Sequence, residues 1–334
     1  MNLSRFPRHI YTPYVTPIEK LEHLTTHLGG PNIYMKRDDL LGLASGGNKT
    51  RKLEFLMADA VAQGADTIVT LGAVQSNHCR LTLAASITEG LKCHLVLEQR
   101  VPGSYDPHGS GNNFLYELLG AEAVYPVEAG ADNVNAKVEE VVADLRAKGR
   151  KPYVIPGGGS NDIGGLGYVA CAQEILNQLY EMQLKIDHIV LTSGSTGTHS
   201  GMLTGMKGSN AHIPITGIGI NRKKDLQTQA VMALCEKLSV KLGLENPPTL
   251  DDIVVFEDYI GDGYSRPTPA MTEAIELLAK KEAILMDPVY TGKTMAGMID
   301  LVKKGYFKDC ENILFLHTGG SPALYAYTDL FFNK

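Results

Sequence analysis

Thr67-Ile68-Val69-Thr70-Leu71 is an unbroken apolar and β-branched run that ends at Gly72. Such a run, bounded by a turn residue, is typical of a strand that is buried on both faces. A polar turn at 75–78 follows, then a helical stretch at about 80–89, and then a second strand at 93–98. A buried strand, a helix and another buried strand in this order predict a βαβ unit and a parallel sheet.

The same alternation of strands and helices extends over most of the chain. It predicts further strands at 32–36, 123–125, 153–155, 186–191, 215–220, 253–256 and 312–316. Between them it predicts helices at 114–119, 134–148, 167–182, from about 199, and at 226–242, 268–281 and 295–303. We therefore expect an α/β protein in which parallel-type twisted sheets are flanked by helices. The glycine-rich stretch 156–167 is the best seam between two domains.

Composition excludes several classes of protein. The 334 residues are 44% hydrophobic, which supports a large core, and the net charge of −6 without a long basic run argues against nucleic acid as a partner. The N-terminus does not have the pattern of a signal peptide, and no stretch is long and apolar enough to span a membrane. The five cysteines are scattered, which argues against disulfides and a metal site and fits a reducing cytoplasm. They are Cys79, Cys93, Cys171, Cys235 and Cys310.

The segment Ser45-Gly46-Gly47-Asn48-Lys49-Thr50-Arg51-Lys52 is a glycine-bearing turn that opens a helix. Asn48 stands where an N-cap residue is expected. Lys49 falls in the first helical turn, where the positive end of the helix dipole disfavours a cation. The plain interpretation is a solvated lysine beside Arg51 and Lys52. The functional one is an amine of lowered pKa that forms a Schiff base with a carbonyl cofactor.

Polar turns follow several of the predicted strands, and ligands of parallel sheets bind at such strand ends. The turn Thr192-Ser193-Gly194-Ser195-Thr196-Gly197-Thr198 leads into a helix, so its N–H groups, hydroxyls and helix dipole favour a phosphate over a plain tight connection. Ser76 and Asn77 fit either a catalytic role or a helix cap, and Tyr290 fits either a ligand contact or a packed aromatic ring. Cys79 is read as a buried thiol more readily than as a nucleophile.

A phosphate site, an unusual lysine and polar turns at one sheet edge together indicate a carbonyl cofactor that carries a phosphate. Pyridoxal 5′-phosphate fits this description, with Lys49 as its covalent partner.

The chain resembles the pyridoxal-phosphate family that contains D-cysteine desulfhydrase, L-cysteate sulfo-lyase and 1-aminocyclopropane-1-carboxylate (ACC) deaminase. The resemblance extends from the block at 3–8 to the block at 317–324. It implies the fold of the tryptophan-synthase-β type (fold type II), with a large domain from 1–50 and 161–334 and a small domain from 51–160. It also implies a homodimer and a small amino-acid substrate.

The resemblance also implies roles for particular residues. Lys49 resembles the Schiff-base lysine, Asn77 the residue that contacts the cofactor's ring hydroxyl, and Ser76 a substrate-side hydroxyl. The turn Ser193, Gly194, Ser195, Thr196, Gly197 and Thr198 resembles the phosphate cup. Tyr290 resembles the aromatic ring over the cofactor, Tyr264 a second substrate-facing tyrosine, and Thr318 the partner of the pyridine nitrogen.

Two positions discriminate within the family. The deaminases typically carry glutamate where this chain has Thr291, and leucine where it has Thr318, so the pair resembles the desulfhydrase branch. A neutral hydroxyl at the ring nitrogen gives a weaker electron sink than a carboxylate, which suits prompt β-elimination.

Other blocks resemble the cysteate enzymes more closely; they are 46–52, 132–136 and 152–161. The sequence therefore predicts β-elimination from L-cysteate to pyruvate, sulfite and ammonia, with Arg266 as either a sulfonate contact or a surface residue. The alternatives are a D-cysteine desulfhydrase, an ACC deaminase, a non-catalytic pyridoxal-phosphate-binding protein and a plain nucleotide-binding protein.

Overall fold

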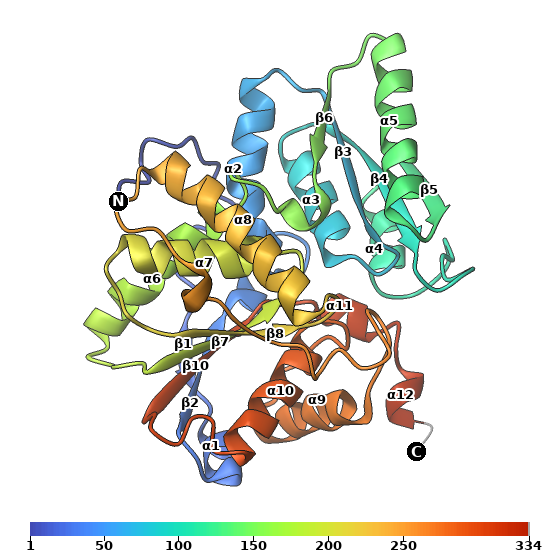
Figure 1. Ribbon diagram of the computed structural model, residues 1–334. Helices are drawn as coiled ribbons and strands as arrows, with labels where there is room; N and C mark the ends of the chain where they lie inside the picture. Colours follow the sequence, from blue (N-terminus) through green and yellow to red (C-terminus); the bar gives the residue numbers. More distant parts are fainter. Residues whose placement is uncertain (333–334) are drawn as a thin grey trace.

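The computed structural model describes residues 1–332, whose strands form two sheets, each flanked by helices (Figure 1). The larger sheet has the strand order β1-β2-β10-β7-β8-β9. Only β1 runs antiparallel to its neighbour, and every other pair in this sheet is parallel. Its strands are β1 (Ile18–Lys20), β2 (Asn32–Arg37), β7 (His188–Ser193), β8 (Ile215–Gly219), β9 (Val254–Phe256) and β10 (Asn312–His317).

The larger sheet is buried on both faces, which explains the continuous apolar runs of its strands. Along β10, Ile313 and Phe315 pack into one core, whereas Leu314 and Leu316 pack into the other. This is the period of two that a strand imposes on its side chains. Helices α1 (Glu22–Leu28), α9 (Pro269–Glu282) and α10 (Thr291–Lys303) cover the first face, and α6 (Leu166–Glu181), α7 (Gly197–Gly208) and α8 (Lys224–Leu242) cover the second.

The smaller sheet is wholly parallel, in the order β5-β4-β3-β6. Its strands are β3 (Thr67–Ala73), β4 (Lys92–Gln99), β5 (Ala123–Glu128) and β6 (Pro152–Ile155). Helices α2 (Lys49–Ala62), α3 (Asn77–Thr88) and α4 (Asn112–Leu118) share its main core, and α5 (Ala131–Ala147) packs on the opposite face. Helix α2 also packs against α6, so it bridges the two sheets.

The remaining elements are short. They are the 3₁₀ turns η1 (Asp38–Leu40), η2 (Gly157–Gly159) and η3 (Leu250–Asp252), and the C-terminal helices α11 (Ser321–Leu324) and α12 (Asp329–Phe332). Within the described chain, no helix is long and apolar enough to cross a membrane.

The fold class predicted from the sequence is confirmed, and each predicted strand appears within a few residues of its expected place. The exception is the segment before residue 43, where β1 and α1 had not been predicted. Both are short, and α1 has no side-chain N-cap hydrogen bond, so neither has a clear local signal. The domain bounds 1–50 with 161–334, and 51–160, stay a prediction, as do the homodimer and the cytoplasmic location.

Candidate active site

The turn before Lys49 has an unusual backbone. Leu43, Ala44 and Ser45 all have positive φ angles of 69°, 32° and 68°, and the two following glycines continue the left-handed path. Left-handed conformations cost a non-glycine residue about 1–2 kcal/mol each, and such strain is found mainly where a functional group must be held in place. The backbone N–H of Asn48 then donates to the carbonyl oxygen of Thr318 at 3.0 Å, which ties the turn to the end of β10.

Lys49 begins α2 and is half-buried at the junction of the two sheets. Burial lowers the pKa of its amine to about 8, the negative charge of Asp287 opposes this shift, and the positive charge of Arg80 adds to it. Lys49 Nζ donates to Asn48 Oδ1 at 3.0 Å and lies 5.9 Å from the centre of the Tyr290 ring. At neutral pH about a tenth of the amine is therefore neutral, against less than a thousandth for an ordinary lysine, and only the neutral amine is a nucleophile.

We call the region around Lys52, Ser160 and the turn 194–198 the anion end of the site. Lys52 is fully buried, and its Nζ donates to the carbonyl oxygen of Gly158 at 3.0 Å. Helix α7 begins here at Gly197, whose N–H donates to Ser160 Oγ at 3.2 Å. The helix N-terminus, the hydroxyls and the buried cation all favour a negatively charged group.

We call the region around Asn77, Tyr290 and Thr318 the ring end. Asn77 begins α3, and Ser76 before it is the N-cap residue, whose Oγ accepts from the Cys79 N–H at 3.1 Å. Thr318 follows β10 directly. The ring end is thus assembled from the ends of β3 and β10, one from each sheet, as expected for a ligand site in parallel α/β proteins.

Tyr290 stands at the start of α10, and its hydroxyl is hydrogen-bonded to that of Tyr264. Asp287 fixes the backbone beneath Tyr290, because its carboxylate accepts from the N–H groups of Val289, Tyr290 and Thr291 at 2.9 Å each. Burial raises the pKa of Asp287 and raises that of Tyr264 to about 12. Both tyrosines therefore keep their protons at neutral pH.

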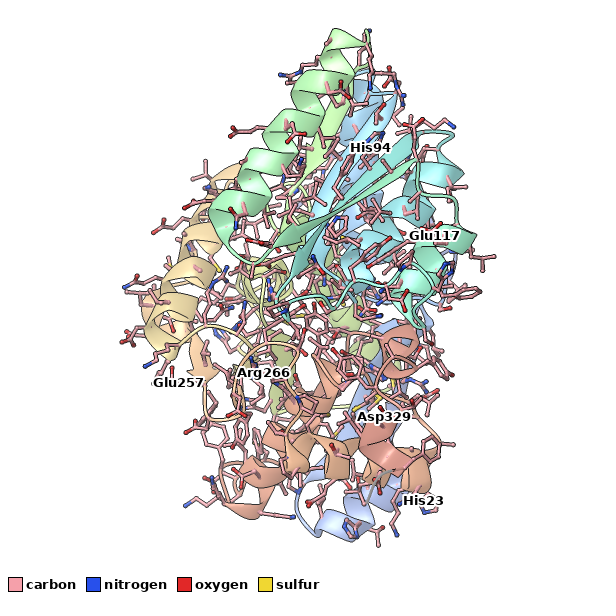
Figure 2. All side chains as sticks on the ribbon, turned by 90° about the vertical axis from the view of Figure 1, so that its right-hand side faces the viewer. His23, His94, Glu117, Glu257, Arg266 and Asp329 are labelled. Atoms are coloured by element: carbon pink, nitrogen blue, oxygen red, sulfur yellow. The ribbon has the colours of Figure 1, made fainter. Side chains whose placement is uncertain are left out.

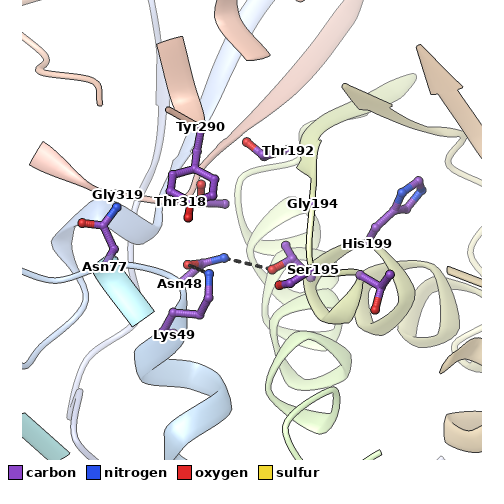
Figure 3. A pocket seen from close by; sticks show the side chains of 12 residues that line it. Asn48, Lys49, Asn77, Thr192, Gly194, Ser195, His199, Tyr290, Thr318 and Gly319 are labelled. Carbon is purple, nitrogen blue, oxygen red and sulfur yellow. Dashed lines mark hydrogen bonds between the residues drawn. The ribbon is translucent and has the colours of Figure 1, made fainter. Parts of the chain in front are cut away.

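Two connected cavities open over Lys49. One, of about 440 Å³, lies between the anion end and the ring end; Figure 3 shows Lys49, Asn77, Tyr290 and Thr318 around it, with Ser195 and His199 from the α7 side. The other, of about 740 Å³, shares Lys49 and Tyr290 and extends past Ser76 and Tyr264. The first is lined by donors that suit a phosphate and a pyridine ring, and the second shares Lys49 and Tyr290 with it.

The structure brings most of the predicted site residues to these cavities. Lys49, Asn77, Gly194, Ser195, Thr196, Thr198, Tyr290 and Thr318 line the smaller one, and Ser76 and Tyr264 line the larger one. Ser193 lies at the end of β7, and its hydroxyl is hydrogen-bonded to His199 and Gln227 instead. Gly197 contributes its N–H to Ser160 rather than a cavity wall.

The structure excludes the plain interpretation of Lys49 and corrects the expectation for Asn48. Lys49 is not a solvated lysine, because it and its neighbours Arg51 and Lys52 are buried or half-buried. Asn48 precedes α2 but does not cap it with its side chain, because Nδ2 donates to Thr198 Oγ1 at 2.9 Å and Oδ1 accepts from Lys49.

Arg266 is exposed on the loop between β9 and α9 and does not line either cavity, which favours the surface interpretation (Figure 2).

Burial raises the pKa of Cys79 to about 12, so it is a buried thiol and not a nucleophile.

Sequence reasoning missed three charged residues at the site: Lys52, Arg80 and Asp287. The signal for Lys52 was its position one turn after Lys49, which places both side chains on one helix face. Asp287 precedes a proline, a pair that often begins a turn. Arg80 gave no local signal, because its burial depends on segments distant in the sequence.

The donors at the anion end fit a phosphate. The buried side-chain cation there is Lys52, whose pKa burial lowers well below its usual range and which has no carboxylate hydrogen-bond partner. A Cβ at Gly197 would stand 2.8 Å from Lys52 Nζ and 2.9 Å from Ser160 Oγ, so only glycine keeps this space free for a ligand. A dianionic group would supply the missing counter-charge.

A half-buried lysine of lowered pKa, a phosphate-type turn and polar side chains around one cavity of an α/β fold are the features of an enzyme that uses pyridoxal phosphate. The model of the pyridoxal-phosphate-dependent enzyme family matches residues 11–319, so the chain belongs to this family. Membership of this family confirms two predictions from the sequence: the protein is an enzyme, and its cofactor is pyridoxal 5′-phosphate.

Relatives over the full length narrow the class further. The chain is 43% identical over 326 residues to the D-cysteine desulfhydrase of Yersinia enterocolitica, which covers 97% of each chain. It is also 43% identical over 327 residues to the D-cysteine desulfhydrase of Klebsiella pneumoniae, which covers 98% of each.

Solved structures agree with this fold. A crystal structure of an ACC deaminase homologue superposes with a TM-score of 0.89 at 38% identity, over 98% of this chain and 96% of the other. The serine racemase of Dictyostelium discoideum, at 16% identity and a TM-score of 0.63 over 92% of each chain, shows the fold alone.

Proposed function

We propose that this protein is a carbon–sulfur lyase that converts D-cysteine and water to pyruvate, ammonia and hydrogen sulfide. One observation of the site carries the proposal: no carboxylate lines the 440 Å³ cavity in the described chain, and Thr318 lies at its ring end. A hydroxyl beside the ring nitrogen favours prompt β-elimination over a long-lived carbanion. The full-length relatives named D-cysteine desulfhydrase support the substrate.

The residues that would hold the cofactor follow from the two ends of the site. Lys52 and the turn 194–198 would bind the phosphate, Asn77 the ring oxygen, and Thr318 the ring nitrogen. When bound, pyridoxal phosphate supplies a carbonyl that condenses with amines and a ring that accepts an electron pair. The side chains of this chain then have to orient the substrate and move protons.

Lys49 would remove the Cα proton, because burial makes its amine lose its proton more readily than an ordinary lysine does and the side chain lines both cavities. Ser76 Oγ already accepts from the Cys79 N–H, so its own proton is free to bind the substrate carboxylate. The Cβ–S bond breaks with its electron pair on sulfur. The hydrogen-bonded hydroxyls of Tyr264 and Tyr290 would give that sulfur a proton.

A second candidate is the same elimination from L-cysteate, with sulfite as the leaving group. It is supported by Arg100 and Arg222, which both line the 740 Å³ cavity beyond Tyr264. Arg100 stacks over the Tyr264 ring at 3.9 Å from its centre, and Arg222 donates to the carbonyl oxygen of Gly194 at 3.0 Å. Two cations suit a sulfonate, although Glu98 already binds Arg100 at 2.6 Å.

The test is a side-by-side assay of the holoenzyme with D-cysteine, L-cysteine, L-cysteate and ACC. Sulfide from D-cysteine at a kcat/KM at least about tenfold above that for the others would support the proposal. Sulfite from L-cysteate as the main product would select the second candidate, and 2-oxobutanoate from ACC would select a deaminase. A protein that keeps its visible absorbance but yields no keto acid from any of them would be a non-catalytic binder.

A further inference from the structure

Arg80 is a buried cation that none of the roles above uses. It lies on α3 one turn after Asn77 and is fully buried. Its Nη1 donates to Asn77 Oδ1 at 2.8 Å and to Asn112 Oδ1 at 2.7 Å, and its Nη2 donates to the carbonyl oxygen of Gly46 at 2.8 Å. None of these partners is a carboxylate, and Nε has no partner in the described chain. Burial lowers the pKa of Arg80 to about 10, and the negative charge of Asp287 opposes this shift without a hydrogen bond to the guanidinium. A buried cation with so little compensation is unfavourable.

The contacts of Arg80 determine which way the Asn77 amide points. Asn112 Nδ2 donates to the same Asn77 Oδ1 at 2.9 Å and to the carbonyl oxygen of Gln75 at 3.0 Å. The oxygen of Asn77 therefore receives two N–H donors. Turning the amide over would place its NH2 group against both of them. Asn77 Nδ2 is thus held on the opposite side, where Asn77 lines the cavity.

Arg80 also connects the two segments that carry Lys49 and Asn77. The carbonyl oxygen of Gly46 belongs to the left-handed turn before Lys49, and the same guanidinium holds Asn77 on α3. The charges that bear on the Lys49 amine are Asp287, which raises its pKa, and Arg80, which lowers it. The positive charge of Lys49 in turn contributes to the lowered pKa values of Lys52 and His78.

We propose that Arg80 is a positioning residue for the cofactor. It fixes the Asn77 amide with its NH2 towards the cofactor's ring oxygen, and it supplies the positive charge that an ionised ring oxygen would neutralise. The inference rests on the ring contact assigned to Asn77 in the proposed function. It does not depend on which amino acid is the substrate.

The test is a double-mutant cycle of Arg80→Met and Asn77→Ala, with cofactor affinity measured by titrating apoprotein with pyridoxal phosphate. Arg80→Met alone should weaken binding by about ten- to a hundredfold, because a charged hydrogen-bond network is lost. In the Asn77→Ala background the same change should cost at least about threefold less, because only the loss of the positive charge then remains. An equal loss in both backgrounds would overturn the proposal, since Arg80 would then not act through Asn77.

The visible absorbance of the bound cofactor gives a second readout. Arg80→Met should move the pH midpoint of its colour change upward, because removing a positive charge makes protonation beside Lys49 easier. Arg80→Lys keeps the charge without the fork of donors, so it should keep the midpoint and still weaken binding. An unchanged midpoint and affinity in Arg80→Met would reject the proposal.

Two further variants control for folding. Leu95→Ala removes a buried side chain from β4 and weakens the same sheet, yet should leave affinity and midpoint within about twofold. If Arg80→Met does not fold, Asn112→Ala removes one donor to Asn77 Oδ1 and keeps Arg80. It should weaken binding by about three- to tenfold, and unchanged binding would contradict the proposal. If the affinities and midpoints come out as expected but the holoenzyme shows no lyase activity, only the proposed substrate would be refuted. The role of Arg80 would stand.

Discussion

At the anion end, the donors are mostly backbone N–H groups and small hydroxyls, and several of them share one partner. At the ring end, single side chains provide the contacts, among them the buried Asn77 and the half-buried Tyr290. Ser160 Oγ illustrates the first design, since it is close to Ser195, Gly197 and Lys52 at once. The difference suggests that anchoring is redundant here whereas chemistry is not, and the variants below test this from the largest expected effect to the smallest.

The largest effect is expected at Lys49, where both ends meet. Lys49→Ala should lower kcat by at least about 10²–10⁴-fold, the usual contribution of a general base, and should alter the visible spectrum of the bound cofactor. Steady-state kinetics and absorbance would measure this. Lys293→Met is the matched control: Lys293 is also buried with a pKa lowered to about 8, but its Nζ donates to the carbonyl oxygens of Ile260 and Gly263. An unaltered spectrum in Lys49→Ala would refute the covalent role.

Lys52 is the fully buried charged donor at the anion end, so the neighbouring neutral donors should not compensate for its loss. Lys52→Met should weaken pyridoxal phosphate binding by about ten- to a hundredfold, the value of a hydrogen bond to a charged group. Binding of pyridoxal, which lacks the phosphate, should change by less than about twofold. Titration of apoprotein with each compound measures the two affinities. An equal loss of affinity for both would show that Lys52 does not act on the phosphate.

The pH dependence of cofactor uptake should report on the Lys49 amine. Its pKa is lowered to about 8, so the amine is protonated below that pH and neutral above it. Only the neutral form attacks a carbonyl, so the rate of pyridoxal incorporation should rise about tenfold per pH unit below 8 and level off above. Stopped-flow absorbance with pyridoxal avoids the titration of a phosphate. A rate that still climbs steeply above pH 9 would indicate an ordinary lysine.

The smallest effect is expected for a single neutral hydroxyl at the anion end. Ser195→Ala should weaken pyridoxal phosphate binding by only about three- to tenfold, because one neutral hydrogen bond contributes about 0.5–1.5 kcal/mol. Thr204→Val, two turns into α7, is the control and should leave binding unchanged. A loss at Ser195 as large as that of Lys52→Met would contradict the redundancy of this end.

The parts of this site that the sequence predicted are those with a local cause. Lys49 and the turn 194–198 each combine glycine with a strand or helix end, so their conformation is encoded within a few residues. The capping role expected for Asn48 was wrong, because its side chain donates to Thr198, which is distant in the sequence, instead of capping α2.

Arg80 and Asp287 could not be predicted, because their burial depends on contacts between segments distant in the sequence. The fold class was predictable for the opposite reason: runs such as Leu314 to Leu316 carry the period of a doubly covered strand within themselves. The short elements β1 and α1 carry no such period.

The left-handed turn at Leu43–Ser45 sets stability against reactivity. Glycine at position 44 or 45 would adopt the same backbone without the steric cost, and the folded chain would gain up to about 1 kcal/mol from the relief. The looser turn would hold the reactive amine less firmly. Selection of random variants for heat tolerance alone would therefore be expected to enrich glycine there while catalytic rate falls, a trade-off common in active-site engineering.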